Sequence, residues 1–169
     1  SARRHGFETM LFIPMETTHF PAYDSGETAV YSFQDDATNQ SVLQAFLSGP
    51  LPVSGVVTQD TAVMEKMPDF DDLMKRAVSD KGLLYISTEP VPVPFNKAAD
   101  FDFKENFYPQ ALDAYRRQIE QTAQNQGYAI AVFPPVPVVL QTLAQWISEN
   151  SKPDIEFVPV SALFTENDK

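Results

Sequence analysis

The sequence predicts an α/β fold in which a mostly parallel sheet alternates with helices. The first observation is a set of five short apolar runs, which are typical of strands. Their hydrophobicity is nearly continuous rather than alternating, as expected for parallel strands that are covered on both faces. The second observation is that helical periodicities lie between these runs. Alternation of this kind predicts parallel strands joined by right-handed crossovers.

The five predicted strands cover residues 8–13, 53–58, 82–87, 128–133 and 155–160. Apolar stripes at helical spacing predict four helices: Val42, Leu43, Phe46 and Leu47; Phe70, Leu73, Met74, Ala77 and Val78; Leu112, Tyr115 and Ile119; Leu140, Leu143, Ala144 and Ile147. Pro109 and Pro137 suit the first turns of the third and fourth helices, where the missing N–H has no cost. Gly82 suits the cap after the second helix, and the third helix should end near Gly127.

Two long connections do not fit this alternation. Residues 14–36 contain only a possible short strand at 28–33, and residues 90–106 are rich in proline and aromatic side chains. Ordered loops of this length are usually functional or packing elements. In parallel α/β folds such loops lie where ligands bind.

Composition excludes several classes of function. The 169 residues carry a formal net charge of −11, which argues against a nucleic-acid or anionic-membrane partner because both require clustered Lys and Arg. The absence of cysteine excludes disulfides, thiolate catalysis and Cys-ligated zinc. The longest apolar stretch, residues 128–140, is broken by prolines and falls short of a membrane span, so we expect no membrane insertion by this chain.

Five stretches occur in the order that is typical of one bacterial family. They are RRHGFE (3–8) with LFIPME (11–16), GVVTQ (55–59), KGLLYIST (81–88), GYAIAV (127–132) and EFVPVSAL (156–163). Together they resemble the divergent polysaccharide deacetylases over nearly the whole chain. The resemblance implies a variant of the deacetylase (β/α) barrel. In active relatives, a divalent metal held by Asp and His activates a water that attacks an N-acetyl carbonyl.

The resemblance also implies that the metal and active-site positions are substituted in this chain. The substituted positions are Phe12, Val57, Thr58, Gln59, Ser87, Pro134 and Val136, where the family carries His, Asn, Asn, His, Asp, His and His. The family's aspartate pair would precede Ser1, so we expect a partial barrel that lacks the first strand–helix units. We therefore expect no catalytic residue, no metal and no cofactor, and a binding or scaffolding role toward a protein partner or cell-wall glycan in the bacterial periplasm or cell envelope.

An alternative is a metal-dependent carbohydrate N-deacetylase, or a related carbohydrate hydrolase, with relocated or upstream ligands for zinc or another divalent metal. The candidate carboxylates at the barrel mouth are Glu16, Asp24, Asp60 and Glu89, and His19 is a candidate metal ligand near the first two. Two carboxylates at a barrel mouth could also hydrolyse a glycoside. The simpler interpretation is that these acidic loop residues are solvated.

Aromatic residues suggest where a partner could bind. Phe101, Phe103, Phe107 and Tyr108 form a dense candidate interface, while Phe20, Tyr23, Tyr31 and Phe33 lie in the first long loop. Such rings are frequent hot spots at binding surfaces. They could instead fill the space of the lost metal site. We expect a single domain over residues 1–169. Because five strands cannot close the family barrel, we also expect an open sheet edge that is covered by a loop, a second chain or an oligomer contact.

Overall fold

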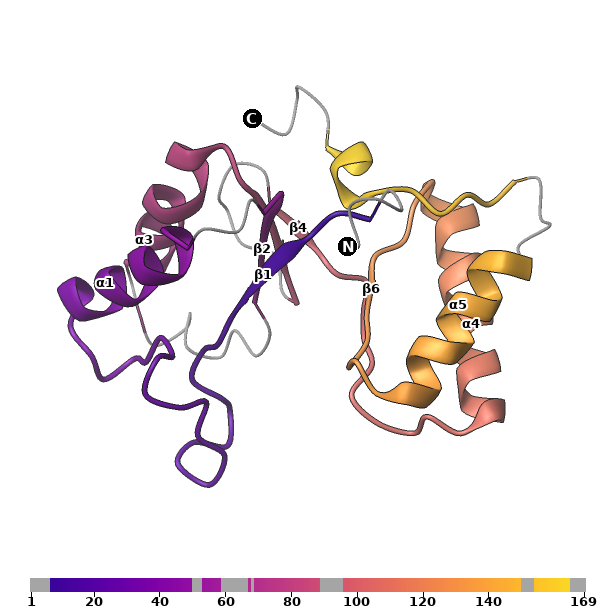
Figure 1. Cartoon of the computed structure of the whole chain (residues 1–169), viewed down its shortest axis with the longest axis horizontal. Helices are drawn as coiled ribbons and strands as arrows, with labels where there is room; N and C mark the ends of the chain where they lie inside the picture. The colour runs from indigo at the N-terminus through magenta and orange to yellow at the C-terminus, as the bar shows by residue number, and fades with distance from the viewer. Residues whose placement is uncertain are drawn as a thin grey trace. The chain divides into compact units, whose positions relative to one another are not determined.

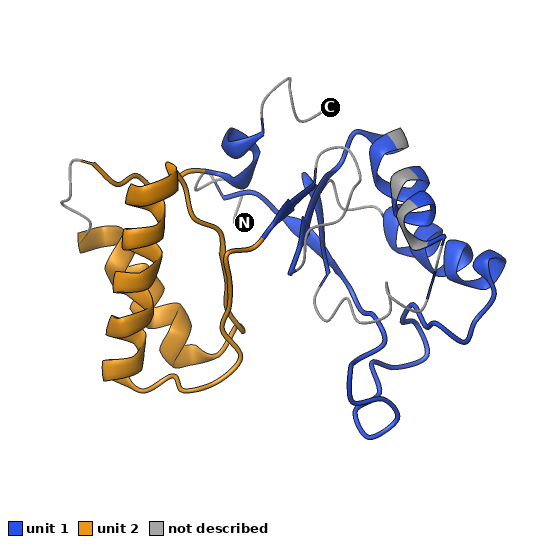
Figure 2. Cartoon of the chain, turned by 180° about the vertical axis from the view of Figure 1, so that it is seen from behind, with its two compact units in different colours: residues 1–98, 159–169 blue, residues 99–158 orange. Residues whose placement is uncertain are grey.

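The structure is a computed structural model that describes residues 7–49, 53–58, 67, 69–88, 96–149 and 154–164. The chain divides into two compact units (Figure 2). The first unit comprises residues 1–98 and 159–169, and the second comprises residues 99–158. That they form a single domain stays a prediction.

The first unit is built on a parallel sheet of four strands. These are β1 (Met10–Ile13), β2 (Gly55–Thr58), β3 (Leu84–Ser87) and β4 (Asn96–Ala98), which lie in the order β1-β2-β3-β4. All three strand pairs are parallel, as the alternation of strands and helices predicted. Within the described residues, β1 and β4 are the edge strands of this sheet. Whether a second chain covers an edge stays a prediction.

Two helices of the first unit, α1 (Asp36–Leu47) and α3 (Phe70–Val78), lie on one side of the sheet (Figure 1). The carboxylate of Asp35 caps α1 by accepting a hydrogen bond from the Thr38 N–H at 2.7 Å. The 3-10 turn η2 (Ser79–Lys81) follows α3. Gly82 ends it at φ 64°, a conformation that glycine adopts without steric cost.

The core of the first unit lies between this sheet and these helices. Its buried residues are Ile13, Met15, Val30, Leu43, Val56, Met67, Leu73, Met74, Val78 and Tyr85. Side chains alternate along a strand, so the buried Ile13 is preceded by Phe12, which is 50% exposed. Gly55 is required where β2 meets β3, because an added Cβ would lie 2.8 Å from the Cβ of Leu84.

The second unit contains two short strands and two helices. The strands β5 (Phe101–Asp102) and β6 (Ala131–Val132) pair in parallel. The helices are α4 (Pro109–Gln126) and α5 (Pro137–Glu149), and both begin at a proline as predicted. Gly127 ends α4 at φ 91°. No helix in the described part of the chain is long and apolar enough to cross a membrane.

The strand predicted at residues 155–160 is wrong. Residues 155–159 have no regular secondary structure, and the 3-10 turn η3 (Val160–Leu163) follows them. Pro159 has no N–H to donate to a sheet, and the Ser161 N–H donates to the Glu8 carboxylate instead. Phe157 and Val158 are 40% and 44% exposed, so this apolar run is not covered as a parallel strand would be.

The second long connection, residues 90–106, contains two strands that the sequence did not predict, β4 and β5. These strands are only three and two residues long, and their pairing partners are distant in sequence. In the first long connection, the possible strand at 28–33 is reduced to one bridge between Met15 and Val30.

Candidate functional site

The carboxyl ends of β2 and β3 carry Thr58 and Ser87, two of the positions that the resemblance predicts to be substituted. Both side chains are fully buried at 0% exposure. The Thr58 hydroxyl lies 2.9 Å from the Tyr85 hydroxyl. Ser87 Oγ accepts a hydrogen bond from the Asn96 side chain at 2.9 Å. Each hydroxyl is thus neutral, buried and paired within the protein, which leaves it poorly suited to hold a divalent cation.

The other positions that the resemblance predicts to be substituted are apolar where they are described. Phe12 and Val57 are register partners on β1 and β2, Phe12 being half exposed and Val57 half-buried. Pro134 and Val136 lie in the second unit, between β6 and α5, and both are half-buried. Gln59 lies outside the described residues, as do the candidate carboxylates Asp60 and Glu89.

Glu16 is buried, with only 3% of its surface exposed. Its Oε2 accepts hydrogen bonds from the Ser32 N–H at 2.9 Å and from the Ser32 hydroxyl at 2.6 Å. The backbone reinforces this contact, because the Glu16 N–H donates to the Val30 carbonyl. The interpretation of this carboxylate as solvated is therefore wrong. Glu16 ties the two sides of the first long loop together.

Asp24 is exposed and holds a tight turn in the same loop. It accepts hydrogen bonds from the Gly26 N–H and the Tyr31 hydroxyl, which lower the pKa of Asp24, the Tyr31 contact most. Tyr31 is buried. Its burial is the largest cause that raises the pKa of its hydroxyl, and the Asp24 carboxylate is the second. The buried Asn39 amide bonds both the N–H and the carbonyl of Tyr31. Asp24 therefore serves loop geometry in this structure.

His19 does not lie in a group of metal ligands in the described part of the chain. No set of three or more His, Asp or Glu side chains close enough to hold a metal ion occurs among the described residues. The His19 ring instead forms a 3.1 Å hydrogen bond with the Thr18 hydroxyl, and its edge packs against Tyr23.

Exposed aromatic rings lie on this anchored loop. Phe20 stacks on Phe33 at a ring-centroid distance of 5.5 Å, and Phe33 packs against Tyr31 at 4.9 Å. Tyr23 and Phe33 are 70% and 65% exposed. We call Phe20, Tyr23 and Phe33 the loop aromatics. Sequence reasoning placed them in this loop but missed their polar anchors Ser32 and Asn39, because nothing nearby in sequence marks those two residues.

The candidate interface of the second unit is partly internal. Phe103 stacks on Phe101 at 5.3 Å and on Tyr115 at 4.0 Å, and it packs against Phe133. These contacts support the interpretation that most of this segment fills space. Of the four predicted residues, Phe107 is half-buried and Tyr108 is 56% exposed.

Comparisons with known proteins point to one family. A family model for divergent polysaccharide deacetylases matches residues 1–164. The fold is similar to the crystal structure of an uncharacterized protein from Agrobacterium tumefaciens C58, with a TM-score of 0.79 and 21% sequence identity. That match covers 96% of this chain and 71% of the other, and it bears on the fold alone. A search of curated proteins found no match.

Proposed function

The chain belongs to the divergent polysaccharide deacetylase family, and on that premise we propose that it is a non-catalytic member. In this proposal it binds a protein partner or a cell-wall glycan in the bacterial periplasm or cell envelope. The observation that carries the proposal is the state of Thr58 and Ser87 at the strand ends. Both are fully buried and hydrogen-bonded to neighbouring side chains.

The chemistry of metal-dependent deacetylation explains why this observation matters. The reaction needs imidazole or carboxylate ligands around a cation that keeps one position open for water. It also needs a base for that water and an acid for the leaving amine. A buried, paired hydroxyl offers neither a negative charge nor an open position. Phe12, at the matching end of β1, is apolar.

The loop aromatics support the binding part of the proposal. Glu16, Asp24 and Asn39 hold the loop by hydrogen bonds, so the rings of Tyr23 and Phe33 project from an ordered backbone. An exposed aromatic ring on an ordered backbone loses little conformational entropy when it binds. Such rings stack on sugar faces or insert into pockets of a protein partner.

Zinc titration followed by an acetate assay tests the absence of catalysis. We expect calorimetry to detect no stoichiometric zinc binding, and we expect no acetate release from chitin or peptidoglycan fragments, because the ligand positions are filled by apolar or paired groups. Tight one-to-one zinc binding together with acetate release would overturn the proposal. It would favour a deacetylase with relocated or upstream ligands.

Co-sedimentation with insoluble peptidoglycan tests the binding surface. We expect the Tyr23→Ala, Phe33→Ala double variant to sediment less than the unmodified protein, because it removes the two most exposed rings of the loop. Phe7→Ala is the matched control, since Phe7 is an exposed ring outside the loop and outside the candidate interface. If the unmodified protein stays in solution, the glycan part of the proposal fails and a protein partner is left. Equal sedimentation of all variants would exclude the loop aromatics.

A further inference from the structure

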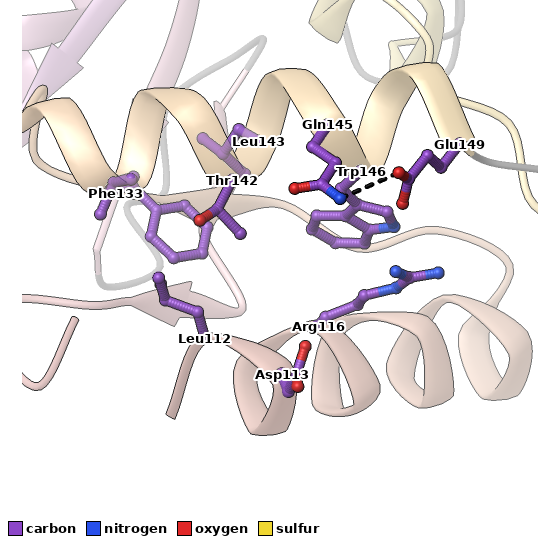
Figure 3. Close-up of a pocket in the computed structure, with 10 residues that line it drawn as sticks. Leu112, Asp113, Arg116, Phe133, Thr142, Leu143, Gln145, Trp146 and Glu149 are labelled. Atoms are coloured by element: carbon purple, nitrogen blue, oxygen red, sulfur yellow. Dashed lines mark hydrogen bonds between the residues drawn. The ribbon is translucent and has the colours of Figure 1, made fainter. Parts of the chain in front are cut away.

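A pocket of about 160 Å³ lies between α4 and α5 in the second unit (Figure 3). Leu112, Phe133 and Leu143 contribute apolar walls. Asp113 and Arg116 reach the pocket from α4, while Trp146 and Glu149 reach it from α5. Asp113 and Glu149 are exposed residues, so the pocket is accessible from solvent on their side. Its lining thus combines apolar surface with hydrogen-bonding groups.

Trp146 provides a buried, unpaired donor beside this pocket. The residue is only 6% exposed, and its indole Nε1 is buried with no hydrogen-bond partner in the described part of the chain. A buried N–H group without an acceptor is unusual in native proteins, because desolvation is then uncompensated. An oxygen atom of a ligand in the pocket would supply the missing acceptor.

Arg116 provides further donors beside the indole ring. Its Nε bonds the buried Glu120 carboxylate at 2.9 Å, and its guanidinium carbon lies 5.7 Å from the centre of the Trp146 ring. This ion pair and the ring contact hold the guanidinium in place. Its terminal nitrogens are then positioned to donate to a second oxygen of a ligand.

The charges around the pocket restrict the ligand further. The acidic residues Asp113 and Glu149 line the pocket together with Arg116, the cation among its described lining residues. An anionic ligand would be repelled by these two carboxylates. A cationic amine has only donors, so it would leave the Trp146 N–H without an acceptor. Neutral hydroxyl groups satisfy both requirements, because each both donates and accepts.

We propose that this pocket binds one neutral pyranose ring of a glycan. The C–H face of the ring would pack on the apolar wall around Leu112 and Phe133. Its hydroxyl groups would accept from Trp146 and Arg116 and donate to Asp113. The pocket volume is close to the ~150 Å³ of a cavity that holds benzene, an unsubstituted six-membered ring. This site deepens the glycan branch of the proposed function and rests on it, but it lies apart from the loop aromatics.

The test uses the fact that Trp146 is the single tryptophan of the chain. Its indole N–H therefore gives one assigned signal in a two-dimensional ¹H–¹⁵N NMR spectrum of the whole protein. The probes are N-acetylglucosamine and glucose, with glucuronate and glucosamine as charged counterparts of the same ring. We expect a saturable shift of this signal with the neutral sugars, and at least several-fold weaker binding of glucuronate and glucosamine.

Two variants separate recognition from folding. Asp113→Asn removes an exposed carboxylate of the pocket and should weaken sugar binding about tenfold, since a hydrogen bond to a charged group is lost. Glu105→Gln makes the same charge change at an exposed residue of this unit that does not line the pocket, and it should bind as the unmodified protein does. An intact spectrum of Asp113→Asn shows that the variant is folded.

Three outcomes would overturn the proposal: no shift of the Trp146 signal with any sugar, a shift that never saturates, or glucuronate binding as tightly as glucose. Failure here is distinguishable from failure of the proposed function. The indole signal reports on the second unit alone, while the difference in peptidoglycan sedimentation between the loop variants and the unmodified protein reports on the first.

Discussion

Glu16 and Tyr31 make the polar contacts that hold the first long loop at the scale of single residues. Glu16 is a carboxylate at a strand end, which sequence reasoning considered for catalysis. Its hydrogen bonds to Ser32 use it for structure instead. Tyr31 joins Asp24, Gly26 and Asn39 in a second set of contacts. The loop therefore owes its shape to a few buried hydrogen bonds, and substitutions can test each of them.

Glu16→Gln should lower the free energy of unfolding by about 1–3 kcal/mol. The charged acceptor of two hydrogen bonds from Ser32 is replaced by a neutral amide, which can accept them only when its oxygen, and not its NH₂ group, faces Ser32. Urea denaturation at neutral pH measures this difference. Glu27→Gln is the matched control, since Glu27 is an exposed residue of the same loop. Equal stabilities of the two variants would mean that the Glu16 carboxylate does not hold the loop.

Tyr31→Phe should change how stability depends on acid pH. The Tyr31 hydroxyl is the largest cause that lowers the pKa of Asp24 below its usual value of 3.8. A carboxyl group whose pKa is lower in the folded state than in the unfolded state stabilises the fold at pH values above its unfolded-state pKa. This stabilisation is lost as the pH falls through the folded-state pKa. The variant should therefore lose less stability than the unmodified protein between about pH 5 and about pH 2.

Urea unfolding at the two pH values and an NMR titration of the Asp24 carboxyl measure this effect. Tyr23→Phe is the matched control, because Tyr23 lies in the same loop and is 70% exposed. If Tyr31→Phe leaves the Asp24 titration unchanged, the contact between these two side chains does not persist in solution.

At the scale of elements, the spacing of β2 and β3 depends on a glycine. Gly55 pairs with Leu84 in the parallel register, and the two backbones approach too closely for a side chain. The helices depend instead on local signals. Asp35 caps α1, and prolines begin α4 and α5. The sheet is thus more sensitive to single substitutions at its contacts than the helix ends are.

Gly55→Ala should lower the free energy of unfolding by about 1–3 kcal/mol, since the added methyl group forces β2 and β3 apart. Gly82→Ala is the comparison, because an added Cβ there meets no atom within 4 Å and only the positive φ opposes it. It should cost about 1 kcal/mol. Thermal unfolding ranks the two variants, and the reverse order would show that the strands adjust at Gly55.

At the scale of the whole molecule, charge limits the partners. A formal net charge of −11 on 169 residues repels polyanions over a Debye length of ~10 Å at 0.1 M salt. We expect no shift of duplex DNA in an electrophoretic mobility assay at about 50 mM salt, where basic proteins bind strongly. A shift that weakens steeply with added salt would contradict this expectation and indicate a basic surface that composition does not reveal.

The sequence by itself determined much of the fold. Local apolar periodicity located α1, α3, α4 and α5, and the continuous apolar runs located β1, β2 and β3. The match to one family was also visible, because glycine, proline and apolar strand residues persist where the fold needs them. These signals were readable because each acts over a few neighbouring residues.

Only the tertiary structure decided the rest. The apolar run at residues 155–160 has the pattern of a strand, yet it is exposed and finds no strand partner in the described part of the chain. The short β4 exists because β3 pairs with it. Glu16 is buried because Ser32 reaches it from sixteen residues away, and Trp146 meets Arg116 across two helices. Pairing and burial depend on residues that are distant in sequence, so no local pattern reports them.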